Sequence, residues 1–155
     1  MSLDTPFQPI GDLIRSHGLA RPDAPAVTVD GKTLSWGQFT ARAERVAASL
    51  QRDGLKPGQS IAIISYTNTD YPVLYMGALM AGVAVAPMPP SATPSQLEAM
   101  VVDSGAPLLF LDQANAEALG GVNFAARIQM IEALDGWLAP GPAAPLDTPN
   151  EALEK

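Results

Sequence analysis

The chain has 155 residues, enough for the hydrophobic core of one domain, and a formal net charge of -7 with only nine Lys plus Arg. This acidic balance offers no basic surface to nucleic acid or to anionic lipid, and we expect neither as a partner. The absence of cysteine excludes disulfides, thiolate chemistry and cysteine-based metal sites in these 155 residues, and we expect a cytoplasmic location.

Two stretches of the chain were considered as a secretory signal or a membrane-spanning helix, and neither has the required pattern. Asp4 and Pro6 interrupt the first residues, so we expect no secretory signal there. Residues 71–96 contain no charged residue, but Gly77, Gly82 and several prolines divide them into pieces shorter than the roughly 20 residues of a spanning helix. We expect this stretch to be core and predict no membrane span.

A short helix and a hairpin are predicted first. Residues 10–17 have apolar side chains at helical spacing. One face of this helix is shared by Ile10, Leu13, Ile14 and His17, which is a core or rim position for the histidine. Because no second histidine or cysteine accompanies His17, we assign it no metal and no chemistry. Residues 26–34 alternate around Asp30-Gly31, the favoured pair for a two-residue turn with positive φ, and predict a β-hairpin.

The next segment predicts a longer amphipathic helix. Ser35 and Gln38 have the spacing of a capping box at its start, and Asp53-Gly54 ends it. The predicted core face is Phe39, Ala43, Val46, Ala47 and Leu50. The charged residues of the opposite side are expected to face solvent: Arg42, Glu44, Arg45 and Arg52.

Strand and helix patterns then alternate. Residues 60–64 are a β-branched run typical of a buried strand, and a polar loop follows in which Asn68, Thr69 or Asp70 can cap a helix. That helix is predicted to end at Gly82 with positive φ. We expect residues 83–86 to be a strand covered on both faces and ended by Pro87, Pro89 and Pro90.

The same unit repeats. Thr93 and Gln96 form a second capping box, and the helix after them is expected to bury Leu97, Met100 and Val101. The later predicted elements are a strand at 108–111, a helix at 114–119, a strand at 126–131 and a helical turn to Trp137. This order predicts an α/β fold, with a mostly parallel sheet, flanking helices in Rossmann-like βαβ units and the N-terminal hairpin.

Proline dominates the end of the chain. We assign residues 1–138 to an N-terminal α/β subdomain and residues 139–155, which lack apolar periodicity, to a linker or tail toward a missing downstream part.

The order of these segments resembles the N-terminal portion of the AMP-forming acyl-CoA synthetase and adenylate-forming (AMP-binding) enzyme superfamily. Five stretches carry the resemblance: residues 21–27, 34–39, 54–62, 79–87 and 103–106. The second is similar to the family pattern Leu-Ser/Thr-Tyr-x-Glu-Leu, with Trp36 and Gln38 at the Tyr and Glu positions. The fourth is similar to Leu-Lys-Ala-Gly-x-x-x-x-Pro, with Met80 in place of lysine.

The resemblance implies the N-terminal subdomain of an acyl-CoA synthetase-like fold. The complete protein would activate a carboxylic acid with ATP and Mg as acyl-AMP and then transfer the acyl group to CoA. The family's phosphate loop ending in Pro-Lys-Gly, its ribose-binding aspartate and its late lysine are absent from this chain, whose lysines are Lys32, Lys56 and Lys155. We therefore expect no catalytic residue, no bound cofactor and no adenylation by this chain alone.

Two groups of residues are candidates for ligand contact. In related ligases the segment after the fourth stretch lies near the CoA nucleotide, which implies the CoA-side candidates Met88, Pro89, Pro90 and Ser91. Open parallel sheets bind ligands at the carboxyl ends of their strands, which suggests Tyr66, Thr67 and Asn68. A strand end or a helix cap explains each residue equally well.

Two functions remain open at this point. The first is a scaffold part of an acid-CoA ligase in fatty or aromatic acid metabolism, with the missing C-terminal part as its partner; fatty, aromatic and amino acids are all possible substrates. The second is a free-standing α/β module that binds a partner or ligand after losing the catalytic half. If a part is missing, we expect an exposed apolar edge and self-association through it.

Overall fold

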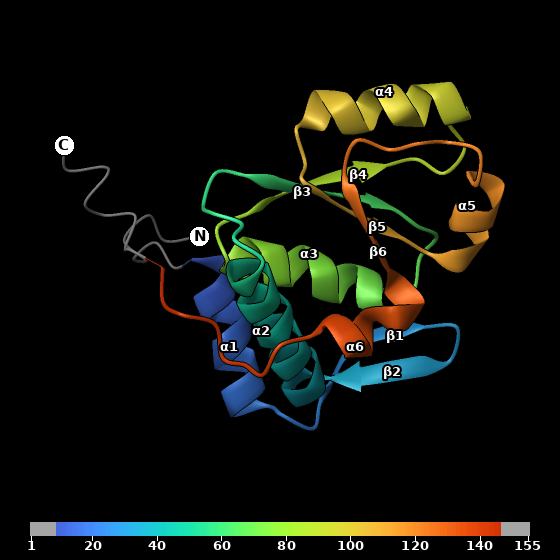
Figure 1. The fold of residues 1–155 in the computed structure, drawn as a ribbon. Coiled ribbons are helices and arrows are strands. Elements are labelled where there is room, and N and C mark those ends of the chain that lie inside the picture. Colours follow the sequence, from blue (N-terminus) through green and yellow to red (C-terminus); the bar gives the residue numbers. More distant parts are fainter. Residues whose placement is uncertain (1–8, 147–155) are drawn as a thin grey trace, which may run out of the picture.

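Four parallel strands form the central sheet of the computed structural model, which describes residues 9–146 (Figure 1). Their order across the sheet is β4-β3-β5-β6. The strands are β3 (Ser60–Ile64), β4 (Ala84–Met88), β5 (Leu108–Leu111) and β6 (Arg127–Met130). The central strands β3 and β5 are almost wholly buried, as their apolar sequences predict. The predicted α/β class with a parallel sheet is confirmed.

Helices cover both faces of the sheet (Figure 1). One face packs on α3 (Asp70–Met80) and α2 (Trp36–Arg52), with α1 (Ile10–Ala20) against both helices. The other face packs on α4 (Pro94–Ser104) and residues near α5 (Gln113–Ala118). A 3-10 turn (Ile131–Ala133) and α6 (Leu134–Trp137) follow β6. The sheet thus separates two apolar cores, of which the one on the α2 and α3 side is larger.

The contact between α2 and α3 depends on one glycine. A Cβ at Gly77 would lie 2.5 Å from the Val46 Cβ and 2.8 Å from the Ala43 carbonyl oxygen. Only a residue without a side chain permits the two helices to pack this closely.

The hairpin and both capping boxes are confirmed. β1 (Pro25–Val29) and β2 (Lys32–Ser35) pair antiparallel around Asp30 and Gly31, which have φ of 49° and 78° as the tight turn requires.

Each capping box exchanges two hydrogen bonds. Ser35 Oγ accepts from the Gln38 amide at 3.2 Å, and Gln38 Oε1 accepts from the Ser35 amide at 3.0 Å. Thr93 and Gln96 make the same exchange at the start of α4. These local sequence signals therefore set the starts of α2 and α4.

The apolar face of α1 is only partly buried. Ile14 is buried, but Ile10 and Leu13 are nearly half exposed. His17 stacks on the Trp36 ring, with centroids 4.8 Å apart, and its Nδ1 lies 3.1 Å from Arg21 Nη2. The main contacts of α1 are with α2 and α3, and they cover a narrower stripe of its surface than its apolar residues suggest.

The structure also corrects the expectation for β4. This strand lies at the edge of the sheet, Ala84 is exposed, and the strand continues through Pro87 to Met88. The Ala84 amide donates to the Gln59 carbonyl at 2.8 Å, so alternate residues face β3 and Pro87 falls at an outward position. Since no neighbouring strand among residues 9–146 needs an amide hydrogen there, Pro87 does not end the strand, which stops directly before Pro89 and Pro90.

The outer surface of α4 differs from its prediction as well. Leu97 and Val101 are buried, but Met100 is 38% exposed. α4 is the helix that lies over this part of the sheet, and no further layer covers its outer side among residues 9–146 (Figure 1). The side chain of Met100 therefore remains at the surface.

The charged side of α2 is tied to neighbouring elements, contrary to the prediction that it is only solvated. Arg42 Nε donates to Asp70 Oδ1 and its Nη1 to Asp135 Oδ1, both at 2.7 Å. Glu44 pairs with Arg15 of α1. These ion pairs connect α2 to α1, α3 and α6.

The described part of the predicted tail lies along α2. The Ala139 amide donates to Ser49 Oγ at 2.6 Å, and Gln51 exchanges two hydrogen bonds with Ala144, of 3.0 and 2.9 Å. Residues 147–155 of the predicted linker lie outside the described residues. The division of the chain at residue 138 stays a prediction.

Candidate functional site

The carboxyl ends of three strands lie level with one another at one end of the sheet, called here the carboxyl edge. Ile64 of β3 is in register with Met88 of β4 on one side and with Leu111 of β5 on the other. The loops that begin after these residues therefore emerge side by side. Both predicted groups of candidate residues lie in these loops.

The strand order makes this end of the sheet a candidate ligand site. The chain leaves β3 toward β4 on one side, crosses back to β5 on the other side and continues outward to β6. The connection that leaves β3 and the connection that leaves β5 therefore run in opposite directions, away from the boundary between these two strands. In open α/β sheets, ligands bind in the crevice that such a topological switch point produces at the carboxyl ends.

A buried carboxylate fastens the loop after β3 to β5. Asp112, only 6% exposed, accepts a hydrogen bond from the Tyr66 amide at 2.9 Å. Its other oxygen accepts from the Asn115 amide at 3.0 Å and from Asn115 Nδ2 at 2.6 Å. One side chain thus caps α5 and holds the loop of the neighbouring strand.

Side chains within the β3 loop complete its fold. Asn68 Nδ2 donates to Ser65 Oγ and to the Tyr66 carbonyl, each at 3.1 Å, and Asn68 Oδ1 accepts from the Tyr71 amide at 2.9 Å. Of the three caps proposed for α3, Asn68 therefore makes the side-chain hydrogen bond. Tyr66 is 59% exposed, and Thr67 is exposed as well.

The loop after β4 presents a small neutral surface. Met88 is buried in the core beneath α4, whereas Pro89 and Ser91 are exposed and Pro90 is half-buried. The capping box of α4 begins two residues after Ser91. Of the four CoA-side candidates, Pro89, Pro90 and Ser91 are therefore available for contact in the described structure.

The loops at this end of the sheet carry no positively charged side chain. Residues 65–70, 89–96, 112–115 and 131–133, which follow the four strands, contain no lysine, arginine or histidine. Within residues 9–146, no group of three or more His, Asp or Glu could hold a metal ion.

The same part of the chain has no helix with the length and apolar character needed to cross a membrane.

Sequence reasoning missed the residue that organises the edge. In the sequence, Asp112 is only the polar residue that follows the predicted strand at 108–111. Its spacing to Asn115 indicates a helix cap, but nothing local predicts its bond to Tyr66, 46 positions earlier.

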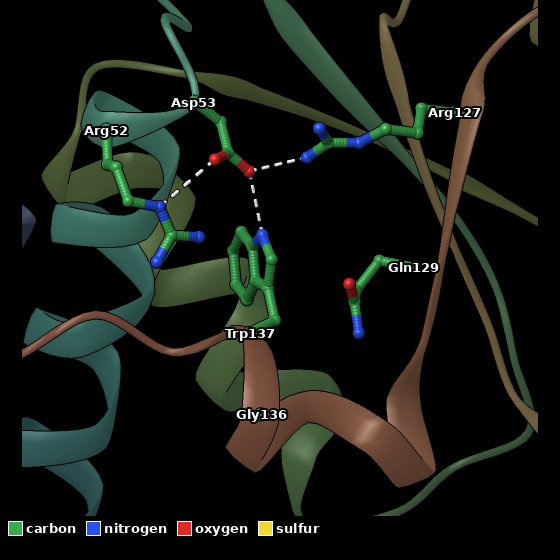
Figure 2. Close-up of a pocket in the computed structure, with 6 residues that line it drawn as sticks. All are labelled: Arg52, Asp53, Arg127, Gln129, Gly136 and Trp137. Atoms are coloured by element: carbon green, nitrogen blue, oxygen red, sulfur yellow. Dashed lines mark hydrogen bonds and ion pairs between the residues drawn. The ribbon is translucent and has the colours of Figure 1, made fainter.

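At the opposite end of the sheet, a hollow of about 450 Å³ surrounds Asp53 (Figure 2). The Asp53 carboxylate lies between two arginines, accepting from Arg52 Nε at 3.1 Å and from Arg127 Nη2 at 2.6 Å. Trp137 Nε1 donates to the same carboxylate at 2.7 Å. Arg127 is the first residue of β6, so this cluster joins the end of α2 to β6 and α6.

Opposite charges hold the hollow together: Asp53 with Arg52, Arg127 and Trp137 is called here the clamp. Partial burial acts to raise the pKa of Asp53, but hydrogen bonds from Trp137, Arg52 and Arg127 outweigh it and hold the pKa below its usual value. The Arg52 guanidinium also lies over the Trp137 ring, 5.8 Å from its centroid. Arg52, Arg127 and Trp137 all donate to the one carboxylate at the centre of the hollow, which indicates a structural role.

A second hollow, of about 570 Å³, lies between α1, the end of α3 and residues 142–146. Its lining is mainly apolar and includes Ile10, Met80 and Leu146, with the Arg15–Glu44 ion pair at its side. It is remote from the carboxyl edge and contains none of the candidate residues.

Comparison with known proteins identifies the family. The family model for AMP-binding enzymes matches residues 14–149. Surfactin synthase subunit 3 of Bacillus subtilis is 34% identical over 63% of this chain and 8% of its own length. The fatty acid–[acyl-carrier-protein] ligase ScoC of Streptomyces coeruleorubidus is 30% identical over 62% of this chain and 18% of its own. The long-chain-fatty-acid–CoA ligase of Salmonella typhimurium is 31% identical, with corresponding shares of 68% and 19%.

Solved structures agree on the fold. The N-terminal domain of FACL13 from Mycobacterium tuberculosis matches with a TM-score of 0.80 and 18% identity, over 89% of this chain and 38% of that one. A putative long-chain-fatty-acid CoA ligase from Rhodopseudomonas palustris matches with a TM-score of 0.79 and 20% identity, over 95% and 40%. The chain therefore spans less than half of the structures, and less than a fifth of the three relatives, that it resembles.

Proposed function

Because the chain belongs to the AMP-binding enzyme family, we propose that it is the N-terminal scaffold part of an ATP-dependent ligase that joins a carboxylic acid to a thiol. The family match over residues 14–149 carries this proposal. The relatives named above include a ligase for CoA and a ligase for an acyl carrier protein, so both thiols are candidate acceptors. The complete reaction would form acyl-AMP from the acid and ATP, with Mg, and release pyrophosphate; the thiol would then attack acyl-AMP and release AMP as the thioester forms.

The carboxyl edge of the sheet is the proposed ligand-facing part of the scaffold. Tyr66, Thr67 and Asn68 belong to a loop held by Asp112, and Pro89 and Ser91 are exposed beside it. An exposed tyrosine ring, a hydroxyl and prolines suit contact with the acyl or pantetheine portion of a substrate, which is long and uncharged.

We further propose that this chain alone does not catalyse adenylation. The support is the distribution of positive charge: the loops after the four strands carry none. Lys32 lies in the hairpin, and Lys56 lies in the turn before β3. The developing charge on the phosphates of ATP needs positioned cations or amide donors, which the downstream part would supply.

Pyrophosphate exchange tests the proposal directly. The 155-residue chain should give no acid-dependent exchange of labelled pyrophosphate into ATP, whereas the longer protein should. The coding sequence after Lys155 provides the companion observation. A glycine- and threonine-rich loop ending in Pro-Lys-Gly downstream supports the ligase; a stop codon directly after Lys155 contradicts it and favours a free-standing binding module.

The candidate loop has its own test in the longer protein. Tyr66→Ala should raise the KM for the acid or the thiol while leaving exchange in the absence of the thiol measurable. Tyr75→Ala in α3, away from the carboxyl edge, is the matched control. An unchanged KM for both substrates would remove Tyr66 from the proposed surface.

A further inference from the structure

The backbone of Tyr66 is held on both sides, although its ring is at the surface. The Tyr66 amide donates to Asp112 Oδ2 at 2.9 Å. Its carbonyl accepts from Ser65 Oγ at 2.7 Å and from Asn68 Nδ2 at 3.1 Å. The residue is nevertheless 59% exposed. The fold therefore fixes the point from which the ring projects and does not cover the ring.

The far end of the same loop is held by an arginine. Asp70 begins α3, and its Oδ1 accepts from Arg42 Nε at 2.7 Å. Arg42 Nη1 donates to Asp135 at 2.7 Å, so one guanidinium connects the loop to α2 and α6. Residues 65–70 are thus fixed near their start by Asp112 and at their end by Arg42.

Asp112 itself has a rigid support. It directly follows β5, whose four residues are all buried. The next amide, that of Gln113, donates to Glu132 Oε1 at 2.9 Å and ties the start of α5 to the turn after β6. Asp112 is therefore fixed relative to β5 and β6, and it fixes Tyr66 relative to the same strands.

The cap of α5 alone does not require an aspartate. One carboxylate oxygen accepts from the amide and the side chain of Asn115, and the other accepts from the Tyr66 amide. Asparagine and serine are equally good helix caps, but each has a single acceptor oxygen in its side chain. The second oxygen of Asp112 is needed for the bond to the loop.

We propose that Asp112 is a positioning residue for substrate binding, which holds the loop 65–70 in the conformation where Tyr66 contacts the acid or the thiol. Arg42 has the same role at the other end of the loop. This inference rests on the proposed function, in which the carboxyl edge faces the substrates. A loop that is already ordered loses little conformational entropy on binding, so both residues strengthen binding without touching the substrate.

Amide hydrogen exchange of the 155-residue chain tests the anchor without any substrate. In Asp112→Asn, the one oxygen should stay with the two donors of Asn115, and the Tyr66 amide should then face an NH2 group. Exchange at Tyr66 should accelerate about fivefold, the effect of one lost hydrogen bond, while the Asn115 amide keeps its protection. Unchanged exchange at Tyr66 would overturn the inference.

Steady-state kinetics of the longer protein test the role in binding, with the KM for the acid and the KM for the thiol measured separately. Asp112→Asn should raise the KM that Tyr66→Ala also raises, about fivefold, and leave kcat within about twofold. The matched control is Asn115→Ala, which removes a hydrogen bond to the same carboxylate but keeps the bond to Tyr66. It should lower the melting temperature and leave both KM values unchanged. Equal KM values for the two variants would overturn the positioning role.

A double-mutant cycle shows whether Asp112 acts through Tyr66. In the Tyr66→Ala background, Asp112→Asn should change the KM by less than about twofold, because the ring that it positions is gone. The full fivefold change in that background would contradict the inference.

Arg42 provides an independent variant at the other end of the loop. Arg42→Ala should raise the same KM, whereas Asp135→Ala leaves the bond from Arg42 to Asp70 and should not. The same KM in Arg42→Ala and wild type would overturn the role of Arg42.

The proposed function and the positioning role fail in different ways. A longer protein without acid-dependent pyrophosphate exchange contradicts the ligase, and amide exchange at Tyr66 still reports on the anchor. An active ligase with the same KM values in wild type and Asp112→Asn contradicts the positioning role alone.

Discussion

The two ends of the sheet differ in how the chain enters and leaves the strands. At the amino end, the chain turns tightly from helix to strand through Gly54, Gly58 and Gly82, all with positive φ, and Asp53 clamps the elements together. At the carboxyl end, the strands run into polar loops that leave Tyr66 at the surface.

The difference shows where this fold has room for function. At the amino end, the tight turns need glycine in a left-handed backbone, and the Asp53 carboxylate is occupied by three donors. Few groups there remain free to contact a ligand. The loops at the carboxyl end are held from beneath by Asp112, so their outward side chains remain available. Substitutions at the two ends should therefore separate stability from binding.

The largest effect is expected from Asp112→Ala. The change leaves the Tyr66 amide and both Asn115 donors without their acceptor in a buried setting and removes the cap of α5, a loss of about 3 kcal/mol in the free energy of unfolding. Urea denaturation measures it, with the exposed Asp103→Ala as control. Equal midpoints for the two variants would show that the loop does not depend on this anchor.

Gly82→Val should be next. Gly82 has φ of 71°, and a Cβ there would lie 3.1 Å from the Pro57 Cβ, so a β-branched residue is strained and crowded, at a cost of about 2 kcal/mol. Thermal unfolding provides the measurement. Gly121→Val, which introduces no close contact at its Cβ, is the control. An unchanged melting temperature for Gly82→Val would mean that the helix ends elsewhere.

Asp53→Asn should cost about 1–2 kcal/mol at pH 7. The folded-state pKa of Asp53 is lowered, so the carboxylate stabilises the fold above its unfolded pKa of about 3.9 and loses this effect as the pH falls through the folded value. The difference between variant and wild type should therefore shrink below about pH 4. Asp23→Asn, at an exposed turn, is the comparison. A difference that stays constant from pH 7 to pH 3 would contradict the clamp.

The smallest effect on stability is expected at the loop surface. Tyr66→Ala should change the free energy of unfolding by less than about 0.5 kcal/mol, because the ring is mostly exposed and the loop is held through its backbone. Urea denaturation of the 155-residue chain measures this directly. A loss comparable to that of Asp112→Ala would place the ring in the structural part of the edge.

Elements with local signals were predictable. The two capping boxes, the Asp30-Gly31 turn and the positive φ of Gly82 all follow from interactions between residues at most a few positions apart. The location of the candidate loops at strand ends followed in the same way, from apolar runs followed by polar residues.

Elements that depend on distant neighbours were not. The exposure of β4 depends on its place at the sheet edge, which no local pattern encodes, and Pro87 is tolerated only because of that place. The clamp joins Asp53 to Trp137 across 84 positions, and the charged side of α2 meets residues up to 99 positions away.

The sequence by itself determined the elements of this protein, its α/β class and its resemblance to the AMP-binding enzymes, because caps, turns and apolar periodicity act over a few residues. Only the tertiary structure decided which strand is central and which is an edge, which carboxylate holds which loop, and which side chains remain free. Those properties depend on burial and hydrogen bonds between segments that are far apart in the sequence, so no local pattern encodes them.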